Sequence, residues 1–330
     1  MDTQLDDAQL LEELDATRER LLGQIRRVIV GQQDVVELML IALFAQGHCL
    51  FIGVPGLAKT LLVSTTAKAL GLDFGRIQFT PDLMPADITG TEVLEEDKST
   101  GGRTMRFIKG PVFTNLLLAD EINRTPPKTQ AALLQAMQER EVTAAGHTMP
   151  LDKPFQVFAT QNPIEQEGTY PLPEAQLDRF MLSINVGYPT EDEELEIVRR
   201  TTVGETPEVE SVVTLEMLIA LQGLVRRLPS SDDVNRYAVR LARSTRPGPG
   251  APSETANWVQ WGAGPRASQY LSVGARVWAA LRGNEVPHID DVKAIAPAVL
   301  SHRIVLNFQA EAEGLTRETV VRRLMEQVRT

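Results

Sequence analysis

The sequence predicts an α/β domain built on a parallel sheet with helices on both faces, followed by an all-helical domain. Up to about residue 190, five short apolar runs typical of buried strands alternate with helical patterns, and such alternation is typical of a parallel sheet. Beyond that point the apolar spacing is helical, with no strand alternation of any length. A chain of 330 residues is long enough for two domains. We expect them at 1–205 and 206–330.

Two helices are expected before the first strand, at about 9–28 and 33–46, and the second is apolar enough to be buried. The strand-like runs are 49–52, 76–79, 115–119, 155–160 and 181–186. Helical patterns separate several of them, notably at 59–70 and 128–141. A capping box formed by Thr190 and Glu193 opens the helical part. The helices expected there are 191–201, 215–227, 231–243, 267–281, 290–299 and 316–328.

The composition indicates a globular protein of a reducing compartment. The hydrophobic fraction is 43%, which is ordinary for a packed core. The single cysteine, Cys49, excludes a disulfide framework. The acidic N-terminus has no apolar region of a signal peptide, and no apolar run approaches the ~18 residues of a membrane span. We therefore expect a cytoplasmic protein without a membrane span.

The net charge of −11 is unevenly distributed. Residues 1–205 contain 18 basic and 31 acidic side chains, a balance of −13, whereas the remainder has a balance of +2. An acidic first domain argues against nucleic acid as a partner without excluding it, because a phosphate backbone needs a basic stripe or channel.

A phosphate-binding loop is predicted where the first strand meets the next helix. The run 52–60 reads Ile-Gly-Val-Pro-Gly-Leu-Ala-Lys-Thr, one residue away from the pattern G-x-x-x-x-G-K-[ST]. Lys59 is expected to reach the β- and γ-phosphates of ATP, and the Thr60 hydroxyl to ligate Mg²⁺. Ala58 stands where the pattern has glycine, which is tolerable if that residue keeps a negative φ. The alternative is an ordinary Gly/Pro turn. The expected nucleotide-binding residues of this loop are Gly53, Pro55, Gly56, Leu57, Ala58, Lys59, Thr60 and Leu61.

Two adjacent carboxylates, Asp120 and Glu121, end the third strand-like run. Alternation along a strand points neighbouring side chains in different directions, so the two can have separate roles. Asp120 suits the Mg²⁺ shell, and Glu121 suits polarising the attacking water. The alternative is a strand that runs into a polar turn. The four histidines have no metal-ligand spacing, so no zinc site is expected.

Four segments together resemble the MoxR family of AAA+ ATPases, and the similarity extends over nearly the whole chain after about Ile29. They are the phosphate-binding loop, 116–124 (Leu-Leu-Leu-Ala-Asp-Glu-Ile-Asn-Arg), 159–163 (Ala-Thr-Gln-Asn-Pro) and 174–180 (Glu-Ala-Gln-Leu-Asp-Arg-Phe). The resemblance implies an ATPase domain with five strands in the order 5-1-4-3-2, a helical lid and a ring, commonly hexameric. The resemblance implies that alanine at position 58 is typical of the family.

The resemblance also assigns roles outside the loop. Asn162 is similar to the sensor-1 residue, which holds the γ-phosphate or the water; the alternative is an Asx-turn before Pro163. Arg179 is similar to the arginine finger, offered to the neighbouring subunit; the alternative is an ion pair with Asp178 or Glu174. Arg266 is similar to the sensor-2 arginine, with Pro265 in the first helical turn; the alternative is an exposed side chain.

Three further segments match family features. Gly31 and Gln32 are similar to the segment beside the adenine base. A helix boundary at Gly31 is an equally favoured alternative. The polar stretch of about 81–109 matches the helix-2 insert, which faces the pore or substrate; a structureless insert of this length is usually functional. Residues 141–155, centred on Gly146-His147, match the hairpin before sensor 1. For both of these stretches, solvated surface is the alternative.

The leading hypothesis is an ATP-driven remodeller of protein clients, acting in the assembly or maturation of an enzyme or protein complex. The resemblance implies a partner with a von Willebrand factor A-type domain. Two alternatives stay open: a nucleic-acid-dependent motor of the same clade, and a nucleotide-gated scaffold with little turnover.

Overall fold

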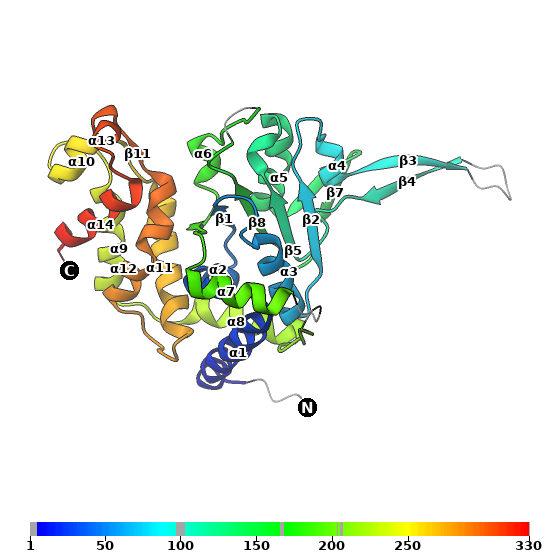
Figure 1. Ribbon diagram of the computed structural model, residues 1–330, viewed down its shortest axis with the longest axis horizontal. Helices are drawn as coiled ribbons and strands as arrows, with labels where there is room; N and C mark the ends of the chain where they lie inside the picture. Colours follow the sequence, from blue (N-terminus) through cyan, green and yellow to red (C-terminus); the bar gives the residue numbers. More distant parts are fainter. Residues whose placement is uncertain (1–4, 97–102, 166–167, 203, 205–206, 330) are drawn as a thin grey trace.

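The first domain is organised around a five-stranded parallel sheet (Figure 1). The computed structural model describes residues 5–96, 103–165, 168–202, 204 and 207–329. The strands of the sheet are β1 (Cys49–Ile52), β2 (Phe74–Gln78), β5 (Leu116–Asp120), β8 (Gln156–Gln161) and β9 (Leu182–Asn185). Their spatial order is β2-β5-β8-β1-β9, which confirms the expected order 5-1-4-3-2.

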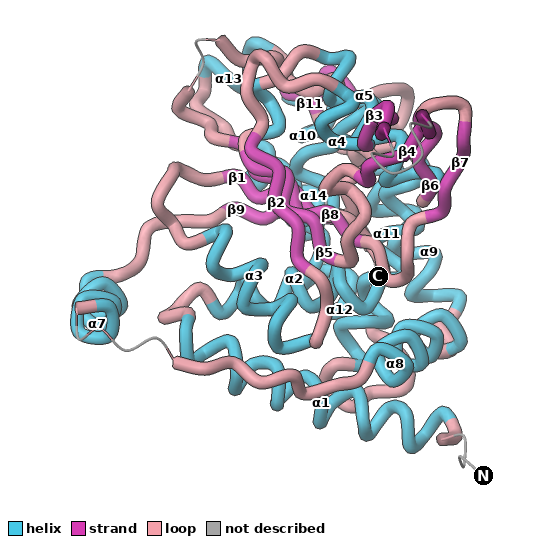
Figure 2. Tube along the Cα trace, turned by 90° about the vertical axis from the view of Figure 1, so that its right-hand side faces the viewer, coloured by secondary structure: helices cyan, strands magenta, loops and turns pink. Residues whose placement is uncertain are grey.

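Helices cover both faces of this sheet, as expected for parallel strands. Alternation along β5 points Leu116 and Leu118 toward one face, where they share a core with α2 (Gln33–Ala45) and α3 (Lys59–Leu70). Leu117 and Ala119 point to the opposite face, which α5 (Pro127–Glu139) covers. Figure 2 shows the sheet edge-on between these layers.

The remaining helices are confirmed at their expected places, with ends that differ by at most two residues. They are α1 (Asp7–Val28), α7 (Glu191–Thr201), α8 (Leu215–Arg227), α9 (Asp232–Ser244), α11 (Pro265–Ala280), α12 (Ile289–Leu300) and α14 (Arg317–Gln327). The short elements α4 (Pro85–Thr89), α6 (Glu174–Leu177), η1 (Ile122–Arg124), α10 (Ser253–Trp258), η2 (Ser301–Arg303) and α13 (Phe308–Ala312) were not expected. Elements of so few residues give no periodic signal.

The helical domain differs from expectation in one respect, because it contains a small antiparallel ribbon of β10 (Val259–Trp261) and β11 (Val305–Leu306). Strands of three and two residues are too short to show alternation. The boundary proposed between residues 205 and 206 lies outside the described residues. Helices α1 and α2 of the first domain pack against α8 and α11 of the second, so the two domains share a continuous core.

The insert of residues 81–109 is not structureless as expected. Its described part consists of α4 and an antiparallel hairpin of β3 (Gly90–Glu96) and β4 (Arg103–Lys109), which projects away from the body of the protein (Figure 1). Leu94 and Met105 are paired across its two strands, and both are exposed. The Gly101-Gly102 turn lies outside the described residues.

The second predicted hairpin is confirmed as β6 (Glu141–Ala144) paired with β7 (His147–Pro150). Ala145 and Gly146 form its turn with φ of 52° and 79°, the left-handed pair that a tight hairpin requires. Cys49 is buried and free. No helix in the described ranges is long and apolar enough to cross a membrane.

Candidate functional site

A cavity of about 430 Å³ lies at the carboxyl edge of the sheet, where parallel strands bring their ends together. The loop before α3 lines it, together with the ends of β2, β5 and β8. The lining residues are Pro55, Gly56, Leu57, Ala58, Lys59, Thr60, Leu61, Arg76, Gln78, Asp120, Glu121, Thr160 and Asn162. The structure therefore brings together the predicted loop, both carboxylates and Asn162.

Lys59 is the first residue of α3 and is nearly buried. Its ammonium group donates to the carbonyl oxygens of Gly53 and of Val54, the latter at 3.2 Å. Burial lowers the pKa of Lys59, and the charges of Asp120 and Glu121 partly offset this effect. The positive charge is thus held at the beginning of a helix of 12 residues, whose free N–H groups favour anions.

Ala58 does not keep the negative φ that we expected. Its φ is 55° and its ψ is 20°, in the left-handed region. That conformation costs an L residue roughly 1–2 kcal/mol. Alanine adopts it all the same, so the loop tolerates the strain and a positive φ does not exclude alanine. Gly56, two residues earlier in the loop, also has a positive φ, of 84°. The expectation failed because the sequence pattern gives no information on the backbone angle that the loop requires.

The two carboxylates at the end of β5 have different partners. Asp120 accepts a hydrogen bond from Thr160 Oγ1 at 2.6 Å and pairs with Arg76 at 2.7 Å. Glu121 accepts from Gln78 Nε2 at 2.8 Å and from Arg124 Nη1 at 2.9 Å. The Glu121 N–H also donates to Thr160 Oγ1 at 2.8 Å. The Thr160 hydroxyl therefore connects the two carboxylate residues.

Sequence reasoning missed four residues that contact the carboxylates: Arg76, Gln78, Arg124 and Thr160. A signal existed for two of them, because Arg76 and Gln78 are two positions apart in an expected strand and so share a face. Register pairs Gln78 with Asp120. Which strand neighbours β5, and at what register, could not be deduced from the strand pattern itself.

The oxygen donors in the cavity fit a magnesium ion. Mg²⁺ is usually held by one or two protein oxygens together with phosphate oxygens and water, and the Thr60 and Asp120 side chains line the same cavity. One oxygen of Asp120 is engaged by Arg76, so the ion would share this carboxylate with an arginine. Within the described ranges, no group of three or more His, Cys, Asp or Glu could hold a metal ion.

A second cavity, of about 140 Å³, adjoins the first on the other side of the loop. It is lined by Val28, Ile29, Val30, Gln32, Gly56, Leu57, Ala58, Leu61, Pro189, Ile197, Arg200 and Thr201. Gln32 Nε2 donates to the Leu57 carbonyl oxygen at 3.2 Å. Gly31 has a φ of 66°, and a Cβ there would overlap the Glu193 carboxylate. Gln32 thus lies beside the loop, with Gly31 next to it in the chain, and their place beside the adenine base stays a prediction. The alternative, a helix boundary, holds because α2 begins directly after them.

Asn162 lines the cavity of about 430 Å³. The alternative interpretation, an Asx-turn before Pro163, holds as well. Its Oδ1 accepts from the Ile164 N–H at 3.1 Å, which is the hydrogen bond of an Asx-turn. The side chain is therefore held in a defined orientation at the end of β8.

Arg179 and Arg266 line neither of these cavities. Arg179 Nη1 donates to the Leu134 carbonyl oxygen at 2.9 Å, and it forms no ion pair with Asp178 or Glu174, all of which the structure describes. The alternative interpretation of Arg179 was therefore wrong. Arg266 follows Pro265 at the start of α11 and pairs with Asp178 at 3.3 Å, so it is not simply an exposed side chain.

Comparisons with known proteins agree with this geometry. A family model described as "ATPase family associated with various cellular activities (AAA)" matches residues 48–182, and a model for the AAA lid domain matches residues 253–324. The chain is 45% identical over 313 residues to Chaperone MoxR1 of Mycobacterium tuberculosis, covering 94% of this chain and 82% of that protein. It is 33% identical to Protein MoxR of Methylorubrum extorquens, and the match covers 91% of this chain and 90% of that protein. A crystal structure of a candidate ATPase from Cytophaga hutchinsonii superposes with a TM-score of 0.89 at 39% identity, covering 97% and 96%.

Proposed function

The chain belongs to the MoxR family of AAA+ ATPases, and on that premise we propose that it hydrolyses ATP to remodel protein clients. The clients would be proteins or enzyme complexes in assembly or maturation. The observation that supports hydrolysis best is the convergence of Lys59, Thr60, Asp120, Glu121 and Asn162 on one cavity. Such a set supplies charge for phosphates, oxygen donors for Mg²⁺ and a base for water.

The loop residues bind ATP across the two adjoining cavities. Free N–H groups at the start of α3 would face the phosphates. Gln32, which lines the second cavity, and its neighbour Gly31 would lie beside the base. Lys59 exchanges the carbonyl oxygens of Gly53 and Val54 for the β- and γ-phosphates. Thr60 and Asp120 would hold Mg²⁺, which would neutralise phosphate charge when bound.

Glu121 acts as the base that takes a proton from the attacking water. Gln78 and Arg124 both donate to its Oε2, so these two hydrogen bonds can persist while Oε1 takes the proton. Thr160 holds the Glu121 backbone and Asp120 in place meanwhile. Asn162 positions the water or the γ-phosphate.

Arg179 and Arg266 complete the reaction from outside the cavity. Arg179 lies apart from its own subunit's cavity, an arrangement that suits a finger offered to the γ-phosphate of a neighbour. Arg266 serves as sensor 2. We accordingly propose a homo-oligomer, hexameric as is common in the family, which acts in the cytoplasm with a partner that has a von Willebrand factor A-type domain.

Replacing Glu121 tests the proposed hydrolysis. The Glu121→Gln variant should bind ATP normally and hydrolyse it roughly 10²- to 10⁴-fold more slowly, because an amide cannot accept the proton. Glu165→Gln is the matched control, since Glu165 also lies near Arg124 but does not line the cavity. Phosphate release and nucleotide binding measure the two effects. Wild-type turnover by Glu121→Gln would refute the assignment, and a wild-type protein that binds ATP without releasing phosphate would favour the scaffold.

Mixed rings test the trans role of Arg179. Arg179→Ala and Lys59→Ala should each be inactive alone, yet a mixture should regain partial ATPase activity. In the mixture, some interfaces pair the intact loop of one variant with the intact finger of the other. If subunit exchange is demonstrated and no activity returns, either Arg179 does not act in trans or hydrolysis requires a wholly competent ring.

Client capture and nucleic-acid addition separate the remodeller from the motor. The Glu121→Gln form should accumulate in the ATP-bound state, and proteins that co-purify with it are client candidates. DNA or RNA should not stimulate ATP turnover, given the acidic first domain. Salt-sensitive acceleration by either would favour the nucleic-acid motor instead.

A further inference from the structure

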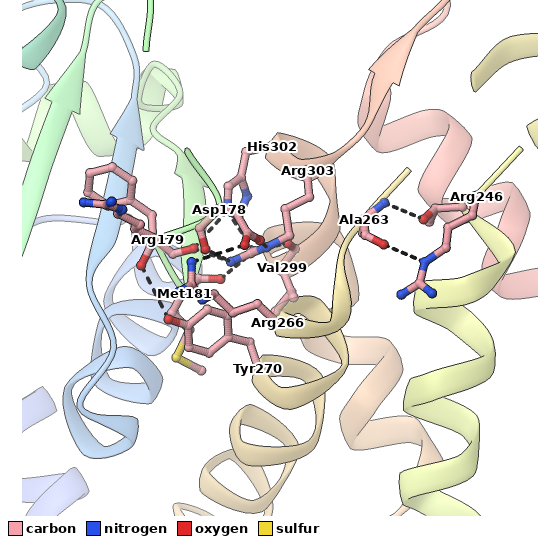
Figure 3. A network of polar contacts seen from close by, with 12 residues as sticks. Asp178, Arg179, Met181, Arg246, Ala263, Arg266, Tyr270, Val299, His302 and Arg303 are labelled. Carbon is pink, nitrogen blue, oxygen red and sulfur yellow. Dashed lines mark hydrogen bonds and ion pairs between the residues drawn. The ribbon is translucent and has the colours of Figure 1, made fainter. Parts of the chain in front are cut away.

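Lid side chains hold the backbone of the segment 178–181, which contains Arg179 and joins α6 to β9. All four of its carbonyl oxygens have a partner in the lid (Figure 3). The Arg303 guanidinium donates to the carbonyl oxygens of Asp178 at 3.1 Å, of Phe180, and of Met181 at 3.1 Å. The Tyr270 hydroxyl donates to the carbonyl oxygen of Arg179 at 3.4 Å.

The Asp178 side chain is shared between two lid arginines that differ in exposure. Arg303 Nε donates to Oδ1 at 2.8 Å, and Arg266 Nη1 donates to Oδ2 at 3.3 Å. The Arg303 side chain is 1% exposed, whereas that of Arg266 is 39% exposed. Arg303 also stacks on the Tyr270 ring at 5.0 Å. Arg303 is therefore a fixed partner of Asp178, and Arg266 is the one that can leave.

A buried guanidinium with several acceptors makes a stiff connection. Hydrogen bonds of charged groups are the stronger ones, and a buried carbonyl that loses its donor is costly. When Arg266 leaves Asp178, Arg303 still compensates the carboxylate. The segment is also held by its own domain. Its four N–H groups donate to carbonyl oxygens there, the Arg179 side chain donates to the Leu134 carbonyl oxygen, and Phe180 is buried in that domain's core. The lid therefore holds the carbonyl side of the segment, and the first domain holds the N–H side.

We propose that Arg303 is a positioning residue for the finger, attaching the segment 178–181 to the lid so that lid movement reaches the neighbour's ATP site. This inference rests on the proposed function, because it needs Arg179 to act in trans. It predicts a specific defect. A subunit without Arg303 should hydrolyse ATP at its own site when its neighbour is intact, but should fail to assist its neighbour.

The test separates these two abilities in mixed rings. The acceptor subunit is Arg179→Ala, which has an intact loop and no finger. Donor subunits all have Lys59→Ala, so only their finger contributes. A donor with Lys59→Ala alone should restore activity. A donor that also has Arg303→Met should restore at least about tenfold less ATPase activity. This loss is smaller than the 10³- to 10⁵-fold rate increase that a trans arginine supplies, because the finger is misplaced and not removed.

Two controls exclude a general folding defect. The first is a donor that also has Arg246→Met, because Arg246 is another lid arginine that donates to a carbonyl, that of Ala263 at 2.8 Å, within the lid (Figure 3). It should restore activity fully. The second is an acceptor with both Arg179→Ala and Arg303→Met, which should be rescued as well as Arg179→Ala by the plain donor. A merely structural role for Arg303 would impair donor and acceptor alike and would overturn the inference.

The outcomes distinguish the inference from its premise. If the Arg179→Ala acceptor and the plain donor do not restore activity in demonstrated mixed rings, the trans finger itself fails. If they do and the Arg303→Met donor works equally well, only the inference on Arg303 is overturned. Should Arg303→Met not fold, Arg303→Lys keeps the charge beside Asp178 but cannot reach all its acceptors. That donor should still fall below the Arg246→Met donor, and equal activity would refute the proposal.

Discussion

The nucleotide cavity and the junction between lid and finger are both built on arginine–carboxylate pairs, yet they use them differently. The junction is the segment 178–181 with Arg266, Tyr270, His302 and Arg303. At the cavity, Arg76 pairs with Asp120, and just outside its lining Arg124 pairs with Glu121. These arginine side chains are 47% and 41% exposed. In the junction, the Arg303 side chain is 1% exposed.

This difference in exposure has a functional consequence. Exposed ion pairs contribute little to stability, so they suit carboxylates whose surroundings change when a metal ion or a water molecule binds. A buried pair is expensive to break because the remaining charge would be uncompensated. In the proposed ATP cycle the cavity would therefore rearrange, whereas the junction would transmit the rearrangement as a rigid connection.

The largest expected contrast between the two regions is in ATP affinity. Lys59→Ala should weaken ATP binding by about 100-fold or more, because hydrogen bonds to charged groups contribute up to about 3 kcal/mol each. Lys68→Ala, on the same helix but exposed, is the control and should bind normally. Arg303→Met should also bind ATP normally, since Arg303 does not line the cavity. Titration with a fluorescent ATP analogue measures all three, and an equal loss in Arg303→Met would abolish the distinction.

Acid should destabilise the folded protein, because His48, directly before β1, and His302, in the junction, are buried and neutral. Burial lowers the pKa of His48 to about 4. Burial, and then the Arg303 charge, lower the pKa of His302 well below its usual value. Between pH 6.5 and 4 the unfolded chain binds more protons at His48 than the folded one, so stability is full above pH 6.5 and is lost as the pH falls. The loss from His48 is up to about 3 kcal/mol.

Urea denaturation at several pH values measures this loss. His48→Gln should remove the His48 part of the pH dependence, whereas His147→Gln, at an exposed hairpin position, should retain it. An unchanged slope in His48→Gln would mean that this histidine is not neutral in the folded protein.

A smaller effect is expected from Thr160, which connects residues within the cavity. Thr160→Val keeps the shape but removes both hydrogen bonds, to Asp120 and from the Glu121 N–H. We expect a stability loss of about 1–3 kcal/mol and a fall in ATP turnover of about tenfold or more, since a misplaced catalytic group costs up to 10²-fold. Thr160→Ser should restore most of both in denaturation and phosphate-release measurements. Full turnover in Thr160→Val would show that the two carboxylates need no such connection.

The smallest effect is expected from Ala58→Gly. Glycine relieves the left-handed strain at this position, so the free energy of unfolding should rise by up to about 1 kcal/mol. ATP affinity should stay unchanged. Ala67→Gly, inside the same helix, should instead lose about 1 kcal/mol or more. A loss of affinity in Ala58→Gly would mean that the Ala58 methyl group itself contributes to the site.

By itself, the sequence determined the features that depend on local backbone preference. The strands of the sheet, the loop at Lys59 and the paired carboxylates at Asp120 and Glu121 follow from apolar period, glycine placement and the polar end of a buried strand. The 5-1-4-3-2 strand order came from the resemblance of four motifs to a family, and not from any of these local patterns.

The tertiary structure alone decided which side chains meet. Thr160 contacts Asp120 because β8 lies beside β5 at one particular register, and Arg303 reaches Asp178 across 125 positions of the chain. The positive φ of Ala58 was not predicted because the loop pattern gives no backbone angle, and the β10–β11 ribbon was not predicted because its strands are too short to show alternation. Periodicity reports which face a residue occupies, whereas strand order, register and the docking of one domain on another depend on the packing of distant segments.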